Sequence, residues 1–132
     1  MCIFCKMVNN EIPCYKVYED KNVLAFLDNS PVNPGHVLVI PKKHYLNLED
    51  IPEDELMNVT KVIKIMAKNL EDKLGVSAYN VVLNNNHLAG QEVLHIHFHL
   101  IPRYKDDGVL LCSKKGLKEN NIEDIYKKLA IK

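Results

Sequence analysis

Three histidines occupy alternate positions of one apolar segment in the C-terminal half of the chain. They are His95, His97 and His99, and the residues between them are large and apolar. This alternation predicts a β-strand, within residues 93–102, that has one apolar face and one imidazole face. Imidazole is the side chain best suited to nucleophilic, acid–base or metal chemistry near neutral pH. A half-buried strand whose histidines only form hydrogen bonds is the alternative, but three in one row favour a functional site.

A polar loop, residues 84–92, comes directly before this strand. Its asparagine and glutamine side chains present amides, and Gly90 would let the backbone approach a ligand closely. Hydrogen-bond donors beside an imidazole face could bind a phosphate group. An ordinary polar surface turn would have the same composition, so the loop alone does not decide between the two.

The rest of the chain has the pattern of an α+β domain. Short apolar or alternating runs predict four more strands, one of them apolar enough to be central in a sheet. Apolar residues at steps of three and four predict one long helix between Pro52 and Gly75. We expect about five strands in a mostly antiparallel sheet with the long helix packed on it, and a short C-terminal helix. The expected strands are residues 14–19, 23–27, 36–40, 79–83 and 93–102, and the expected helices are residues 53–74 and 121–129.

The composition limits the class of protein. The 132 residues are expected to form one domain, and 17 basic against 17 acidic residues give a formal net charge of zero. This balance argues against nucleic acid as the main partner. No run approaches the ~20 apolar residues of a membrane span and no secretory signal is recognisable, so we expect a cytoplasmic protein without membrane contact. The four cysteines would then be free thiols or metal ligands.

Two stretches of the chain together resemble the histidine-triad (HIT) superfamily of nucleotide hydrolases and transferases. Residues 89–103, AGQEVLHIHFHLIPR, resemble its signature, and residues 26–31 and 35–44 resemble its first half. The likeness is to bacterial HIT hydrolases, related to the Hint and Fhit branches. It covers residues 1–106, and residues 107–132 form a C-terminal extension. The resemblance implies a HIT-like fold, a purine nucleotide cleaved at its α-phosphate, a homodimer, and no catalytic cofactor.

The resemblance also implies roles for individual residues. His97 would attack the phosphorus and hold the nucleotidyl group covalently, since a neutral imidazole is a competent nucleophile at neutral pH. The backbone carbonyl of His95 would hold the other ring nitrogen of His97 as N–H. His95, His99 and Gln91 complete the implied catalytic group. The implied nucleotide-binding residues are Phe26, Asp28, Asn29, Asn84, Gly90, Gln91, Glu92, Val93, His97 and His99.

Three of these positions admit more than one role. Asp28, implied to accept hydrogen bonds from the ribose, could merely cap a turn. Phe26, implied to line the base pocket, could be a core residue. Glu92 stands where the Hint and Fhit branches have a hydroxyl residue, and a carboxylate there would repel phosphates. We expect only its backbone N–H to face the substrate, unless a raised pKa makes Glu92 a general acid. We assign no role to His36 or His87.

A Cys-x-x-Cys pair, Cys2 and Cys5, lies near the N-terminus. Two thiolates at this spacing can share one tetrahedral zinc ion, or the two residues could be small apolar fillers. The resemblance implies that His44 and His95 complete a zinc site. A site closed by four protein ligands would be structural rather than catalytic.

Three functions remain open at this point. The resemblance favours a hydrolase that acts on nucleoside phosphoramidates and acyl nucleotides, or on dinucleoside polyphosphates. A nucleotide-binding adaptor or sensor with vestigial hydrolysis is the alternative. The third is a zinc hydrolase in which His95, His97 and His99 bind one ion, although same-face neighbours on a strand rarely converge on one metal.

Overall fold

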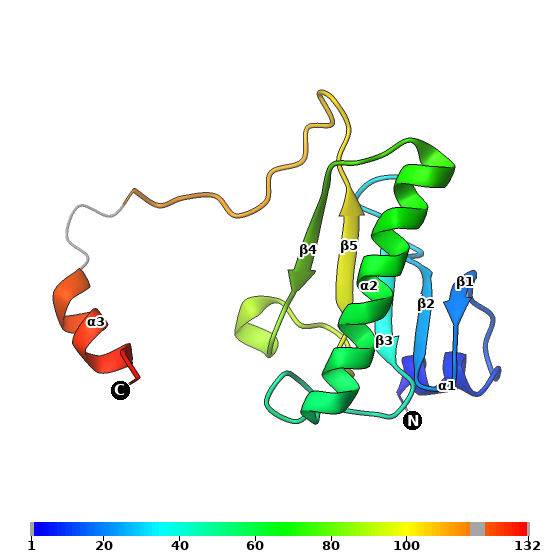
Figure 1. Ribbon diagram of the computed structural model, residues 1–132, viewed down its shortest axis with the longest axis horizontal. Helices are drawn as coiled ribbons and strands as arrows, with labels where there is room; N and C mark the ends of the chain where they lie inside the picture. Colours follow the sequence, from blue (N-terminus) through cyan, green and yellow to red (C-terminus); the bar gives the residue numbers. More distant parts are fainter. Residues whose placement is uncertain (1, 117–120, 132) are drawn as a thin grey trace.

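The structure, a computed structural model, describes residues 2–116 and 121–131 (Figure 1). Three α-helices, five strands and a short 3₁₀ helix follow one another in these residues. In chain order they are α1 (Ile3–Val8), β1 (Lys16–Glu19), β2 (Val23–Leu27), β3 (Val37–Pro41), α2 (Glu53–Leu74), β4 (Tyr79–Leu83), the 3₁₀ helix (His87–Ala89), β5 (Phe98–Pro102) and α3 (Ile122–Leu129).

The five strands form one sheet in the order β1-β2-β3-β5-β4. Every neighbouring pair is antiparallel, which confirms the predicted α+β class. All five residues of β3 are buried, as expected for an apolar strand in the middle of a sheet. Its last residue is Pro41, which was expected to lie just beyond the strand.

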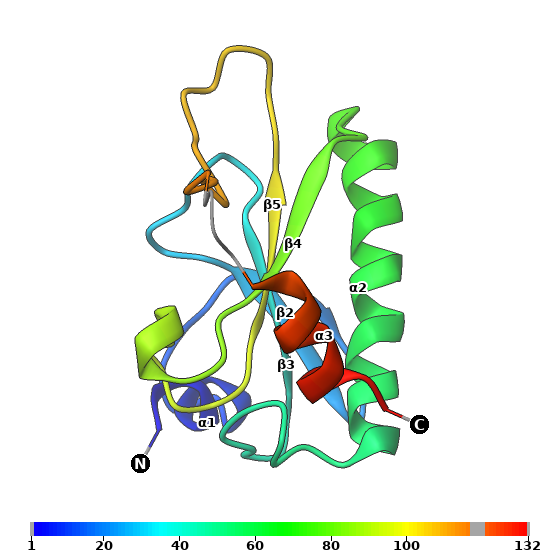
Figure 2. The ribbon, with the colours of Figure 1, turned by 90° about the vertical axis from the view of Figure 1, so that its left-hand side faces the viewer.

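Helix α2 covers one face of the sheet (Figure 2). Its buried residues, among them Val59, Met66 and Leu70, recur at helical spacing and pack against Val39 and its neighbours on the sheet. The helix spans the predicted residues because Gly75 ends it in the left-handed conformation, with φ 69°. The buried apolar residues between α2 and the sheet form the larger of two hydrophobic cores in the described residues.

Helix α1 covers the opposite face, and the sequence pattern did not predict it. Phe4 and Met7, one turn apart, pack on Leu24 and Phe26 of β2. Consecutive strand residues point to opposite faces, so β2 contributes alternate side chains to the two cores. Helix α1 therefore brings the N-terminal cysteine pair against the face that carries the histidines.

The histidine strand is shorter than predicted. Only residues 98–102 pair in the sheet, so His95 and His97 lie in the irregular segment that precedes β5. The partners explain this limit, because Phe98 already lies opposite Leu83, the last residue of β4. The N–H of Ile96 donates instead to the carbonyl of Tyr45 at 2.7 Å.

A carboxylate fixes the chain where it leaves β5. Asp107 accepts hydrogen bonds from Nε and Nη2 of Arg103 at 2.9 and 3.0 Å and from Nδ2 of Asn33 at 3.0 Å. It also accepts from the backbone N–H groups of Tyr104 and Val109. Beyond this point α3 has no buried residue and lies apart from the sheet in Figure 1.

Within the described residues, no helix combines the length and apolar character needed to cross a lipid bilayer.

We predict that Asp107→Asn lowers the melting temperature by a few degrees at pH 7. The Arg103 guanidinium holds the pKa of the Asp107 carboxyl well below its usual range. This stabilisation is complete above the unfolded pKa, about 4, and is lost as the pH falls toward the folded pKa. Thermal melts followed by circular dichroism should show the difference from wild type at pH 7 and its narrowing in acid. Asp106→Asn, the adjacent exposed change, is the control; equal effects of the two substitutions would contradict the assignment.

Candidate active site

Two cavities open on the face of the sheet that α1 covers. His99 lies opposite Leu38 of β3, whose side chain packs in the α1 core, so His99 faces the same way. The first, here called the α1 cavity, has a volume of about 240 Å³. The second, here called the tail cavity, has a volume of about 320 Å³ and includes Leu111 of the C-terminal segment in its wall. Both cavities are lined by Asp28, Ser30, Glu92, His97 and His99.

The tautomer of His97 follows from its backbone contact. Its Nδ1 lies 2.8 Å from the carbonyl oxygen of His95, which can only accept, so Nδ1 carries the proton. Burial is the main cause that lowers the pKa of His97 below its ordinary value. The ring is therefore neutral near pH 7, and its Nε2 holds a free lone pair.

His99 has the opposite tautomer. The backbone N–H of Val32 donates to Nδ1 of His36 at 3.0 Å, so the proton of the neutral His36 ring is on Nε2. That Nε2 lies 3.0 Å from Nδ1 of His99 and donates to it, which leaves the His99 proton on its Nε2. Burial, with smaller contributions from the neighbouring His97 and His36 rings, lowers the pKa of His99 to about 4. The site thus combines a lone pair on His97 with an N–H donor on His99.

His36 is a site residue to which the sequence pattern assigned no role. It is 3 % exposed, and its Nε2 also lies 3.6 Å from Oδ2 of Asp28. Its position just before the apolar strand β3 was visible in the sequence. The pairing of β3 with β5, which joins it to His99, was not.

Asp28 and Phe26 each have a structural contact and also line a cavity. Oδ1 of Asp28 accepts the Ser30 N–H at 2.8 Å, so the turn-capping role is confirmed, while the residue also lines both cavities. Phe26 is 2 % exposed within the α1 core and also lines the α1 cavity. Asn29 and Val93 line the α1 cavity as well.

The polar loop divides into residues that line a cavity and a residue that supports them. Asn84 and Gly90 line the tail cavity, and Gly90 has φ 93°, which favours glycine. Gln91, predicted to be catalytic and nucleotide-binding, lines neither cavity. Its Oε1 accepts the Asn86 N–H at 2.7 Å and its Nε2 donates to the carbonyls of Leu46 and Val93. Gln91 therefore holds the shape of the loop.

Glu92, whose backbone N–H alone was expected to face a substrate, lies at both cavities. The residue is exposed and lines both cavities, and its negative charge is one of the influences that raise the pKa of His97 against the larger effect of burial. Among the described residues the Glu92 carboxylate has no ion pair and no hydrogen bond.

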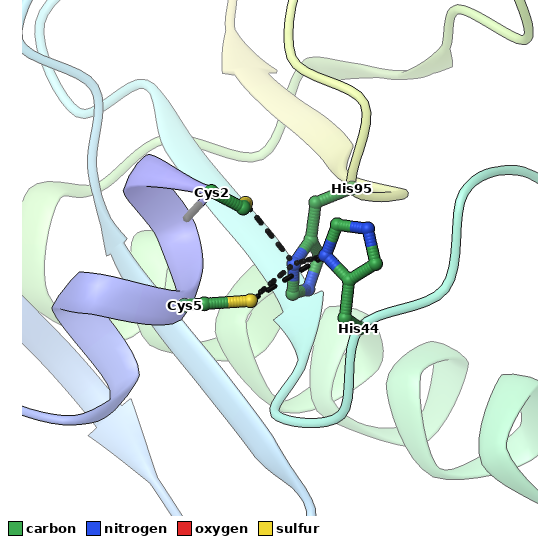
Figure 3. Close-up of side chains that lie close together, drawn as sticks. All are labelled: Cys2, Cys5, His44 and His95. Atoms are coloured by element: carbon green, nitrogen blue, oxygen red, sulfur yellow. Dashed lines mark hydrogen bonds between the residues drawn. The ribbon is translucent and has the colours of Figure 1, made fainter.

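The four predicted metal ligands lie together (Figure 3). Nδ1 of His95 lies 3.6 Å from each of the Cys2 and Cys5 sulfurs, 3.4 Å separates Cys5 Sγ from His44 Nδ1, and 3.2 Å separates the two Nδ1 atoms. Tetrahedral zinc with its usual bond lengths requires about 3.5 Å between S and N and about 3.3 Å between two N ligands. The geometry fits zinc. Nε2 of His95 donates to the Pro41 carbonyl at 2.8 Å, which leaves Nδ1 as the ligand atom.

The structure separates the three histidines by role. His95 belongs to the Cys/His group, whereas His97 and His99 line the cavities. A single ion bound by all three is therefore not supported. A second group, Asp28, His36 and His99, could also surround an ion, but its two rings already form a hydrogen bond with each other.

A family model and similar sequences all relate the chain to one protein family. The model of the HIT domain family matches residues 9–106. The chain is 51% identical over 130 residues to an uncharacterized HIT-like protein of Methanocaldococcus jannaschii, with 98% of each chain covered. It is 44% identical over 110 residues to the adenosine 5'-monophosphoramidase HNT1 of Saccharomyces cerevisiae, covering 83% of this chain and 67% of the yeast protein.

A solved structure is also similar. It is a Zn-bound histidine triad family protein from Mycobacterium smegmatis, with a TM-score of 0.79 and 34% identity. The alignment covers 86% of this chain and 83% of that one. On these matches, in sequence and in fold, the chain belongs to the HIT domain family.

Proposed function

We propose that the protein is a nucleotide hydrolase that cleaves purine nucleoside phosphoramidates at the α-phosphate through a covalent nucleotidyl-His97. The observation that carries the proposal is the 2.8 Å contact between Nδ1 of His97 and the carbonyl of His95, because it leaves Nε2 unprotonated. A neutral ring nitrogen can attack phosphorus without a separate base. The named activity of the yeast relative is of the same class.

The α1 cavity suits the nucleoside. Its apolar wall includes Ile3, Phe4 and Phe26, which can contact a purine ring. Oδ2 of Asp28 is directed toward His36 at 3.6 Å and remains able to accept hydrogen bonds from ribose hydroxyls. The phosphate would then lie where the two cavities meet, beside His97 and His99.

The reaction needs two displacements at phosphorus. In the first, a bond forms between Nε2 of His97 and phosphorus while the P–N bond of the phosphoramidate breaks, and the amine leaves with a proton from water. In the second, water attacks the phosphorus, releases the nucleoside monophosphate and restores the neutral ring. The Nε2–H of His99 would donate to an oxygen as charge develops. The backbone N–H groups of Glu92 and Val93 have no partner among the described residues and can do the same.

The charge of the site favours phosphoramidates over dinucleoside polyphosphates. No lysine or arginine is among the described residues that line either cavity, and Asp28 and Glu92 are. A polyphosphate chain carries several negative charges and is normally bound by cationic side chains. The leaving group of a phosphoramidate is an amine. The substrate therefore carries no negative phosphate charge other than that of its α-phosphate.

A structural zinc ion in the Cys/His group is part of the same proposal. When bound, it would join α1 to the segment before β5 by coordinating two thiolates and two imidazoles. The similar structure from Mycobacterium smegmatis is Zn-bound, which supports zinc as the metal. The role is structural, since four protein ligands close the coordination sphere.

The protein is also proposed to form a homodimer through α2 and β4. β4 is an edge strand, and α2 packs mainly against β2, β3 and β5. Tyr79 and Val81 of β4 are therefore 40 % and 48 % exposed on the α2 side of the sheet. An exposed apolar edge of this kind is suited to a second copy.

The first test is His97→Ala. We expect a loss of at least ~10³-fold in kcat on adenosine 5'-phosphoramidate, with AMP binding within roughly tenfold of wild type, because the ring acts in the chemical step. Steady-state kinetics and isothermal titration calorimetry measure the two quantities. His87→Ala, in the exposed loop, is the control. Full activity of His97→Ala would refute the mechanism, and a wild type that binds AMP but cleaves no substrate would favour the adaptor.

The zinc assignment predicts about one zinc ion per chain in the purified protein, measured by mass spectrometry of the metal content. Replacing both Cys2 and Cys5 by Ser should remove the ion and lower the melting temperature more than the catalytic rate. Cys112→Ser, at an exposed cysteine outside the metal group, should leave both the zinc content and the melting temperature unchanged. Absence of zinc from wild type, together with an unchanged melting temperature in the double variant, would contradict it.

The dimer predicts a mass of twice 15.1 kDa by light scattering at micromolar concentration. Val81→Lys places a charge on the exposed edge and should shift the protein toward the monomer. Tyr15→Lys, beside the opposite edge strand, should not. A monomeric wild type would count against the proposal.

A further inference from the structure

Among the described residues, Glu92 is the one exposed carboxylate that lies at the junction of the two cavities without a partner. Asp28, the other carboxylate there, already accepts the Ser30 N–H and faces His36. Glu92 has neither an ion pair nor a hydrogen bond in this part of the chain, and it lines both cavities, where its charge is available to a ligand.

The surroundings do not neutralise this charge. The His36 and His99 rings are neutral, because Nδ1 of each ring accepts a hydrogen bond and therefore carries no proton. No described lining residue is a lysine or an arginine. Beyond the phosphate, a substrate therefore meets a local negative charge.

The tail cavity is the place left for the leaving group. The α1 cavity has the apolar walls that suit a base, and the phosphate lies at the junction. Besides His99, the tail cavity is lined by the apolar residues Val32, Ile101 and Leu111. A chain attached to the departing nitrogen would lie along these apolar residues, with Glu92 beside it.

We propose that Glu92 is a specificity-determining residue that selects leaving groups carrying a positive charge. The ligand class is a nucleoside 5'-phosphoramidate whose amine substituent bears a second, protonated amine, as in the amides of diamines. This inference rests on the proposed function and adds to it the chemistry of the leaving group. The bonds that form and break are those of the two displacements: His97 Nε2–P forms, P–N breaks, and the diamine leaves with one added proton.

Three adenosine 5'-phosphoramidates of similar size test the inference. Their nitrogen substituents are aminopropyl, butyl and carboxyethyl groups, which end in a positive, a neutral and a negative group. We expect kcat/KM in wild type to fall in that order, with about tenfold between the first and the last, as for a partly exposed charge pair. The ratio should shrink as salt is added, because an exposed interaction is screened.

For each variant we compare the ratio of kcat/KM between the aminopropyl and carboxyethyl compounds. A general loss of activity cancels in this ratio. In Glu92→Gln the tenfold preference should fall to about twofold or less, and in Glu92→Lys the order should reverse. Glu71→Gln makes the same charge change on α2, across the sheet, and should keep the wild-type ratio. Melting temperatures near that of wild type show that each variant is folded.

The outcomes separate the two claims. If wild type cleaves all three compounds without a preference for charge, or if Glu92→Gln keeps the preference, the selector role is overturned and the proposed function stands. If wild type cleaves none of them, the proposed function fails and this inference fails with it.

Discussion

Two backbone carbonyl groups decide what the buried imidazoles can do. The carbonyl of Pro41 accepts from Nε2 of His95, and the carbonyl of His95 accepts from Nδ1 of His97, both at 2.8 Å. A buried ring that donates from one nitrogen and is neutral has a lone pair on the other. In His95 that lone pair faces the Cys/His group, and in His97 it is available to a substrate. The same kind of contact therefore leaves the lone pair on Nδ1 in His95 and on Nε2 in His97.

The fold supplies these contacts through elements that are distant in sequence. Strand β3 ends at Pro41, which brings its carbonyl to His95, and the residue before β3, His36, meets His99 across the β3–β5 pairing. Helix α1 closes the other side, with the Phe4 ring edge-on to His97 at 5.2 Å between centroids. Burial by this helix and the sheet keeps the rings neutral, and a neutral lone pair beside an N–H donor suits the nucleotidyl transfer that we propose.

The sequence predicted the fold class and the long helix well, because both depend on local patterns. The apolar stripe of α2 and its end at Gly75 are readable without knowing the neighbours. The geometry of the site was harder to predict from the sequence. The alternation around His97 suggested a strand, yet pairing stops at Phe98 because β4 ends at Leu83. The link from His36 to His99 and the inward position of Gln91 depend on register and loop packing, which composition does not encode. Helix α1 has only six residues, too few for a clear period.

The nucleotidyl-His97 intermediate is the central claim, and trapping it is the most direct test. The protein would be mixed with an adenosine phosphoramidate labelled at phosphorus, quenched during turnover and digested, and the labelled peptide would be sequenced by mass spectrometry. We expect phosphorus on the ring of His97, appearing and decaying at rates compatible with turnover. Product formation with no label on that ring, or with the label on another residue, would contradict it.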